Sequence, residues 1–249
     1  MRDTQMSRTI AAVMLPILMI AAGSPAFADR GPRDDEDDQE ITEWLRKDEK
    51  GKQYQKAEEE LRGILDDAEE EEIPSGILMN KVREGASKRV TEEVLVSAVE
   101  SELARLRTAR TILEANAVSF PSEEAYQNAL KELSLFLLNG LTEEQLSRLL
   151  AEAQAGRMGI RAALAAGKTL MVIVAINGLD EQQISRLGDA LLASEFSPEG
   201  YDSVASLFLK ANVYRIDIAD IVEPVIEILR GGGGLVQLEN AVRRRIQTR

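Results

Sequence analysis

Four apolar stretches of helical length recur along the chain, and each is followed by a short polar corner and a second amphipathic segment. In the segment from Glu92 to Ala115, for example, Leu95, Val99 and Leu103 recur at the spacing of one helical face. The pattern therefore predicts pairs of helices joined by short turns. The four first helices are expected from Ile77 to Ala86, Ala125 to Leu138, Ile160 to Ile176 and Val204 to Tyr214.

Two of the corners are nearly identical in sequence. The stretch Asn139–Leu149 recurs almost letter for letter as Asn177–Leu187. Such fidelity over eleven residues indicates internal repeats, which point to a stacked architecture. The repeated stretch is therefore the best guide to how the chain is built.

The repeated stretch has the features of a helix start. Thr142 is placed to accept hydrogen bonds from the free N–H groups of the first turn, and Gln145 completes a capping box. Asp180 and Gln183 take the same places in the second copy. A glycine stands two residues before each cap, where the preceding helix would end in the left-handed conformation that glycine tolerates; these are Gly140 and Gly178.

Weaker copies of the corner flank the two strong ones, at Val90–Leu95 and Ile216–Ile221. The apolar residues before the caps stand at positions 90, 141, 179 and 216, so successive copies are 51, 38 and 37 residues apart. A single helical hairpin cannot bury its apolar face, so neighbouring hairpins must stack. We predict an all-α fold, a solenoid-like array of about four stacked αα-hairpin repeats, closed by a helix from Leu235 to Ile246.

Several local expectations accompany this fold. Leu170–Ile176 is apolar on every side, as in a central helix covered all round. Its β-branched residues also suit a strand, but the Leu-rich copy at Leu130–Leu138 favours a helix. Ser75 is expected to cap the first helix, and Pro224 to kink the last second helix or delay its start.

The first residues have the organisation of a secretory signal. A positively charged start, an apolar run from Ile10 to Ala22 and the small-residue site Ala26-Phe27-Ala28 predict a signal peptide over residues 1–28. We expect a disordered acidic linker over 29–40, a polar helical leader over 41–73 and the helical-repeat domain over 74–249. The protein is therefore predicted to be exported to the bacterial periplasm or the outside, with no stable membrane insertion after signal cleavage.

Charge and composition narrow the chemistry. The net charge is −13, which disfavours nucleic-acid binding, since such proteins need a basic surface. The chain has no cysteine and no histidine, so it lacks the strongest ligands for zinc, copper and haem and the usual base–nucleophile pairs. No calcium-loop spacing occurs in the acidic leader. We assign no catalytic residue, no cofactor and no metal site.

Three residue groups could suggest a function, but a structural role explains each of them better. Gly167-Lys168-Thr169 resembles the end of a phosphate-binding loop, yet Ala162 stands where that motif needs a glycine. We interpret it as a close contact between helices. Arg148 and Arg186, at matching positions in the two copies, are expected to form structural ion pairs, and Trp44 to anchor local packing.

A short segment of the chain resembles one in a group of uncharacterised exported bacterial helical proteins. Pro74, Leu78, Lys81, Glu84-Gly85 and Lys88 match their P-x-x-x-L-x-x-K-x-x-E-G-x-x-K pattern. The resemblance implies export and helical hairpins, and it brings no known activity.

We therefore expect a non-catalytic exported protein that presents a helical surface to a protein partner in the cell envelope. Two alternatives stay open. One is a carboxylate-dependent, glycosidase-like cell-wall enzyme, because two carboxylates suffice for that chemistry. The other is a carrier that holds a lipid or small ligand in a cavity between helices. The sequence does not indicate an oligomeric state.

Overall fold

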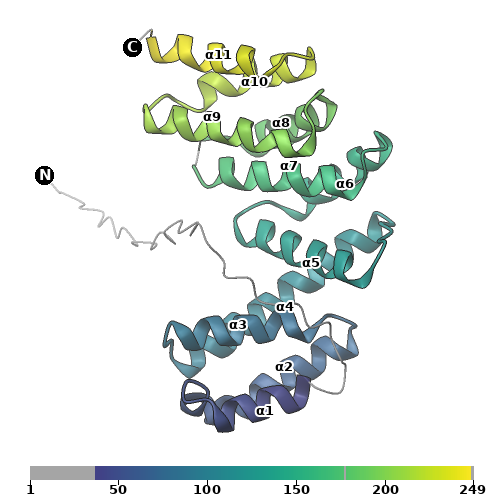
Figure 1. Cartoon of the computed structure of the whole chain (residues 1–249), viewed down its shortest axis with the longest axis vertical. Coiled ribbons are helices and arrows are strands. Elements are labelled where there is room, and N and C mark those ends of the chain that lie inside the picture. Colours follow the sequence, from purple (N-terminus) through teal and green to yellow (C-terminus); the bar gives the residue numbers. More distant parts are fainter. Residues whose placement is uncertain (1–36, 177, 248–249) are drawn as a thin grey trace, which may run out of the picture. The chain divides into compact units, whose positions relative to one another are not determined.

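All regular structure in the described residues, 37–176 and 178–247 of a computed structural model, is helical (Figure 1). This confirms the predicted all-α class. None of these helices is long and apolar enough to cross a membrane. Two short 3-10 helices, Lys52–Ala57 and Pro198–Gly200, accompany eleven α-helices: α1 Asp37–Lys47, α2 Glu58–Glu70, α3 Ser75–Ser87, α4 Glu92–Ala115, α5 Glu123–Leu138, α6 Glu143–Ala155, α7 Gly159–Val174, α8 Glu181–Ala193, α9 Tyr201–Val213, α10 Ala219–Arg230 and α11 Leu235–Gln247. The signal peptide predicted over 1–28 and the linker residues 29–36 lie outside the described part.

The repeated corners start helices in the predicted way. The Thr142 hydroxyl accepts a hydrogen bond from the Gln145 amide at 3.2 Å, and the Gln145 side chain accepts one from the Thr142 amide at 2.9 Å. Asp180 and Gln183 make the same pair of bonds at 2.7 and 3.1 Å. Both capping boxes are therefore confirmed, and each satisfies two amides that the helix itself leaves free.

Two other helix starts differ from the prediction. Ser75 is the first residue of α3 and not its cap, because Pro74, with φ fixed at −60°, takes the cap position. The Asp217 carboxylate accepts from the Ala219 amide at 3.0 Å, two residues on, so α10 begins at Ala219. The helix then runs unbroken through Pro224.

Helix α1 begins at Asp37, inside the segment for which an acidic linker over 29–40 was predicted. Ile41 and Leu45 are fully buried and lie four residues apart, so packing fixes the helix on which they stand. Acidic residues at a helix N-terminus interact favourably with the helix dipole, which lets the helix extend back into the acidic run.

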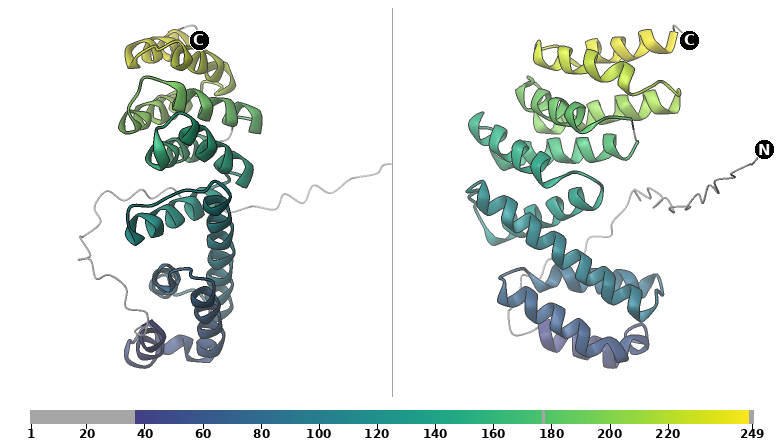
Figure 2. Two further views of the ribbon diagram at one scale, coloured as in Figure 1. Left: turned by 90° about the vertical axis from the view of Figure 1, so that its right-hand side faces the viewer. Right: turned by 180° about the vertical axis from the view of Figure 1, so that it is seen from behind.

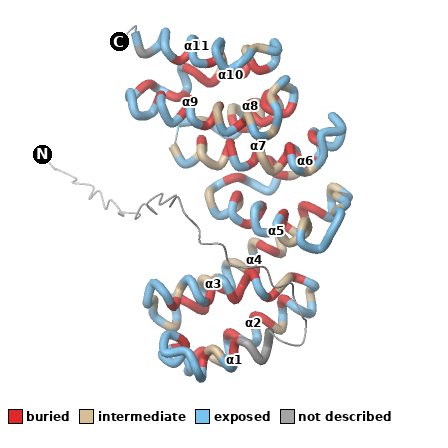
Figure 3. Tube along the Cα trace, in the orientation of Figure 1, coloured by how far each residue is buried: buried red, intermediate tan, exposed pale blue. Residues whose placement is uncertain are grey.

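Except for α3, the helices from α2 onward form two sets that pack along the chain order (Figure 2). The even-numbered helices α2, α4, α6, α8 and α10 each contact the next of the set, and so do the odd-numbered helices α5, α7, α9 and α11. Contacts between the sets include α4 with α5, α6 with α7, α7 with α8, and α10 with α11. Buried and exposed positions alternate along the helices (Figure 3).

The segment Leu170–Ile176 forms a helix up to Val174, as predicted, but it is not covered on every side. Leu170 and Ile173 are buried, whereas Val172 and Ile176 are partly exposed. Helix α7 contacts α5, α6, α8, α9 and the 3-10 helix Pro198–Gly200, yet Arg161 and Lys168 on it are exposed. An apolar helix in the middle of a two-layer stack can therefore still have a solvent-facing side.

The polar leader packs on the first pair of helices. The Trp44 ring stacks on Tyr54 with ring centroids 6.5 Å apart, and the Tyr54 hydroxyl donates to the Val90 carbonyl at 2.9 Å. Helix α1 also contacts α3, and α2 contacts α4. Trp44 thus anchors local packing, and one hydrophobic cluster extends from Ile41 to Val242.

Candidate protein-binding surface

The corners that end α5, α7 and α9 lie along one edge of the helical stack, which we call the corner edge (Figures 1 and 2). Gly140 has φ of +96°, the left-handed conformation predicted for it, and a Cβ there would lie 3.4 Å from Val174. A Cβ on Gly178 would lie 3.1 Å from the Cβ of Ile218 in the next corner. The glycines therefore also let each corner approach the following unit closely.

The last turns of α5, α7 and α9 carry accessible apolar side chains beside these corners. Leu138 is 52% exposed and Val213 is 77% exposed. Leu138, Ile176 and Val213 each stand four positions before the expected cap of their corner, so they are equivalent in the repeat. We define the apolar strip as six residues: Leu135 and Leu138 on α5, Val172 on α7 with Ile176 in the turn after it, and Leu209 and Val213 on α9.

Single exposed apolar residues are normal on a soluble protein and need no explanation. The strip differs because α5, α9 and α7 with the turn after it each contribute two such residues at the same end. Helices α5 and α7 contact each other, as do α7 and α9, and packed helices lie about 8–10 Å apart. The strip therefore extends roughly 16–20 Å across the stack.

Carboxylates border the strip on its corner side. The even-numbered helices begin there, and acidic residues at a helix start are favoured by the dipole. The six exposed carboxylates at the corners are Glu143, Glu144, Asp180, Glu181, Asp217 and Asp220. Each corner segment runs from the residue after Leu138, Ile176 or Val213 to the third residue after the expected cap. Arg215 is the one cation in the sequence of these three segments.

The two equivalent arginines clamp the even-numbered helices to one another. Arg148 on α6 donates two hydrogen bonds to Asp189 on α8, at 3.0 and 2.6 Å. Arg186 on α8 donates two to Glu223 on α10, at 2.7 and 2.6 Å. Glu223 stands at the position in the last unit that is equivalent to Arg148 and Arg186 in theirs. These residues therefore join units, in line with their predicted structural role.

The Gly167-Lys168-Thr169 segment is part of the helix contact expected for it. All three residues lie inside α7, where a Cβ on Gly167 would come within 2.7 Å of the Phe136 ring on α5. Thr169 is fully buried, and the Lys168 amine lies 3.6 Å from the Asp202 carboxylate. A phosphate-binding loop needs free amides before a helix start, and amides in mid-helix are already bonded.

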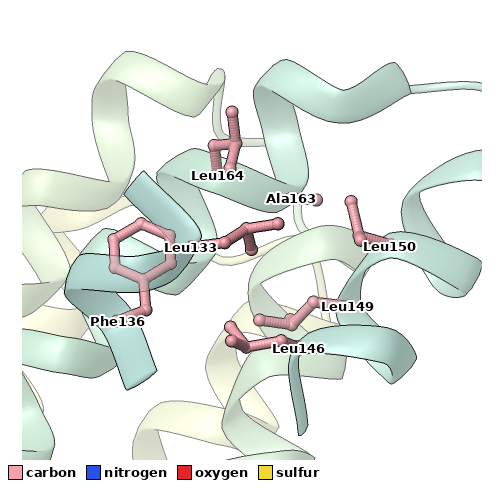
Figure 4. Close-up of a pocket in the computed structure, with 7 residues that line it drawn as sticks. All are labelled: Leu133, Phe136, Leu146, Leu149, Leu150, Ala163 and Leu164. Atoms are coloured by element: carbon pink, nitrogen blue, oxygen red, sulfur yellow. The ribbon is translucent and has the colours of Figure 1, made fainter. Parts of the chain in front are cut away.

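An apolar depression lies between α5, α6 and α7 (Figure 4). The roughly 160 Å³ of non-atom space there includes open solvent, and it is too narrow to enclose a water-sized molecule. Pockets for small ligands usually enclose 300–1,000 Å³ and include a few polar groups that fix orientation. This depression is smaller, and its lining is apolar throughout: Leu133, Phe136, Leu146, Leu149, Leu150, Ala163 and Leu164.

The shifted pKa values of carboxyl groups have local structural causes. Backbone and hydroxyl hydrogen bonds at helix starts lower the pKa of Glu93 and of Glu199. Arg107 hydrogen bonds hold the pKa of Glu71 below its ordinary value despite partial desolvation. Burial raises the pKa of Glu132, an effect that the charge of Lys168 opposes. In the part of the chain that the structure describes, no group of three or more Asp or Glu residues is arranged to hold a metal ion.

Comparison of the chain with protein-family models, with curated proteins and with solved structures gives no significant match. The apolar strip was not foreseen from the sequence. Aligning the corners on their caps would have placed Leu138, Ile176 and Val213 in one register. Periodicity alone does not show which apolar side of a helix lacks a neighbour.

Proposed function

We propose that this protein is a non-catalytic helical-repeat protein that binds a partner protein through its apolar strip. The observation that supports the proposal is the strip itself, three pairs of accessible apolar side chains with Val213 at 77% exposure. A contiguous exposed apolar patch bordered by polar residues is typical of protein-binding surfaces.

The repeat arrangement is part of the same proposal. Helices α3 to α10 are interpreted as four stacked αα-hairpins, with α11 closing the stack. The two identical capping boxes support this interpretation, as do the equivalent arginines that reach the next even-numbered helix. In such an array each unit contacts mainly its neighbours, which leaves one long row of equivalent surface positions available for recognition.

The place of action is proposed from the N-terminal sequence. If residues 1–28 are a signal peptide, the mature chain works in the periplasm or outside the cell, and the partner is a protein of the cell envelope. Detection of a mature N-terminus at Asp29 by mass spectrometry of the exported protein would support this location. An intact N-terminus at Met1 or Met6 in the mature protein would contradict it.

Site-specific photocrosslinking tests the binding surface. A photoreactive amino acid replaces Val213 on the strip or Val236 at the start of α11, a matched valine that is 69% exposed. The full-length protein is then irradiated in its native cells. We expect a discrete crosslinked protein adduct from position 213 and none of the same mass from position 236. Identical adduct patterns at the two positions, or no adduct at position 213, would rule out the strip as the binding surface.

A further inference from the structure

We infer that the apolar strip accepts a basic amphipathic segment of the partner protein, with its cationic side turned toward the corner edge. This inference rests on the proposed function and adds the chemistry of the partner. Two features of the surface support it: an apolar row without a covering helix and a border of carboxylates along one side of that row.

The apolar row sets the length and pattern of the segment. Three packed helices place the outer members of the strip about 16–20 Å apart. A helix advances 1.5 Å per residue, so a bound helix needs roughly 11–13 residues to cover that distance. Its apolar residues must recur at helical spacing on one face to meet the strip.

The carboxylate border sets the charge of the segment. The corner segments from each strip end to the third residue after each cap hold six carboxylates and one arginine, Arg215. All six carboxylates are exposed. A partner segment rich in Asp or Glu would place like charges beside them, which is unfavourable, whereas Lys or Arg residues would be attracted. Such complementarity gives selectivity and faster association, and both weaken as salt screens exposed charges.

The opposite side of the strip has a different charge. Lys131 and Glu132 on α5 are both exposed and precede Leu135, and Lys210 on α9 is exposed between the strip residues Leu209 and Val213. Lys168 on α7 is already close to Asp202, at 3.6 Å. Charges of both signs therefore lie on that side, whereas the corner side is predominantly acidic. A bound segment should orient its cations toward the corners.

Two synthetic helical peptides test the inference. Each has about 14 residues, slightly more than the roughly 11–13 residues that cover the strip. Both peptides carry leucine on one face. One has lysine on the other face, and its counterpart has glutamate. Fluorescence anisotropy of the labelled peptides is measured with the full-length protein. We expect the lysine peptide to bind at least about tenfold more tightly than the glutamate peptide, because like charges repel at the border.

Two matched pairs of variants separate binding at the strip from general attraction to an acidic protein. Val213→Glu and Val236→Glu add the same charge at similarly exposed sites. Only Val213→Glu should weaken binding of the lysine peptide, by about three- to tenfold, since it removes apolar contact. Its added negative charge alone would instead strengthen binding.

The second pair probes the carboxylate border. The double change Glu143→Gln with Glu144→Gln removes an acidic pair at the corner edge. The double change Glu123→Gln with Glu124→Gln removes an equally exposed pair at the start of α5, away from that edge. We expect only the first double variant to weaken binding of the lysine peptide and to reduce its dependence on salt.

Equal binding of the two peptides would overturn the inference and leave the proposed protein-binding strip standing. Equal effects of Val213→Glu and Val236→Glu would also overturn it, because the peptide would then bind elsewhere. If neither peptide binds, the inference fails, and the crosslinking result at position 213 decides separately whether the strip binds a protein.

Discussion

The close contact at Gly167 allows a sharp prediction about what holds α5 and α7 together. Replacing Gly167 by alanine adds a Cβ that would lie 2.7 and 2.9 Å from two atoms of the Phe136 ring. The ring is almost fully buried, with 2% of its surface exposed, so it has little room to shift. Gly63 in α2 has no atom within 4 Å of the same added group and is exposed, so it serves as the matched control.

The expected magnitude is the difference between two opposing effects. Overpacking a well-filled core costs about 1–3 kcal/mol, while alanine is favoured over glycine in a helix interior by about 1 kcal/mol. Gly167→Ala should therefore lower the free energy of unfolding by roughly 0–2 kcal/mol. Gly63→Ala should raise it by about 0.5–1 kcal/mol, because only the helix effect acts there.

Thermal unfolding followed by far-ultraviolet circular dichroism measures both variants. In a chain of this size each kcal/mol corresponds to roughly 2–4 °C in Tm. We expect Gly167→Ala to melt below Gly63→Ala, by about 2–4 °C or more. Adding Phe136→Leu removes the ring atoms that the new Cβ would meet, so in that background Gly167→Ala should no longer destabilise. Equal Tm changes for the two glycine variants, or a penalty that persists with Phe136→Leu, would refute the packing explanation.

Three further predictions concern the contacts within and between units. A double-mutant cycle on Arg186 and Glu223 should give a coupling of about 0.5–1 kcal/mol in the free energy of unfolding, typical of a partly exposed bidentate pair; a coupling near zero would contradict the interhelix clamp. Thr142→Ala should destabilise by about 1 kcal/mol through loss of the cap, and Thr142→Asp should restore most of that loss in urea unfolding; lack of rescue would exclude capping as the cause. Because Arg107 lowers the pKa of Glu71 in the folded state, that pair stabilises the fold above the ordinary carboxyl pKa, and the contribution is lost as pH falls through the lowered value. Glu71→Gln should therefore flatten the decline of stability in acid, and an unchanged acid profile would argue against the pair.

The sequence alone determined the local structure of the corners. A cap and its glutamine partner lie three residues apart, so Thr142 with Gln145 and Asp180 with Gln183 can close their hydrogen bonds without any distant residue. The same locality explains why the helical class was correctly predicted. The prediction was wrong for the start of α3. There Pro74, and not Ser75, takes the cap position, because the fixed φ of proline suits it.

Only the tertiary structure decided which residues meet across units and which remain uncovered. Arg148 pairs with Asp189, 41 positions later. The close contact at Gly167 is made with the Phe136 ring of another helix. Val213 and Val222 are both apolar, yet the first is 77% exposed and the second fully buried. Burial depends on the neighbouring helix that covers a side chain, and that neighbour is set by the stacking of the whole chain.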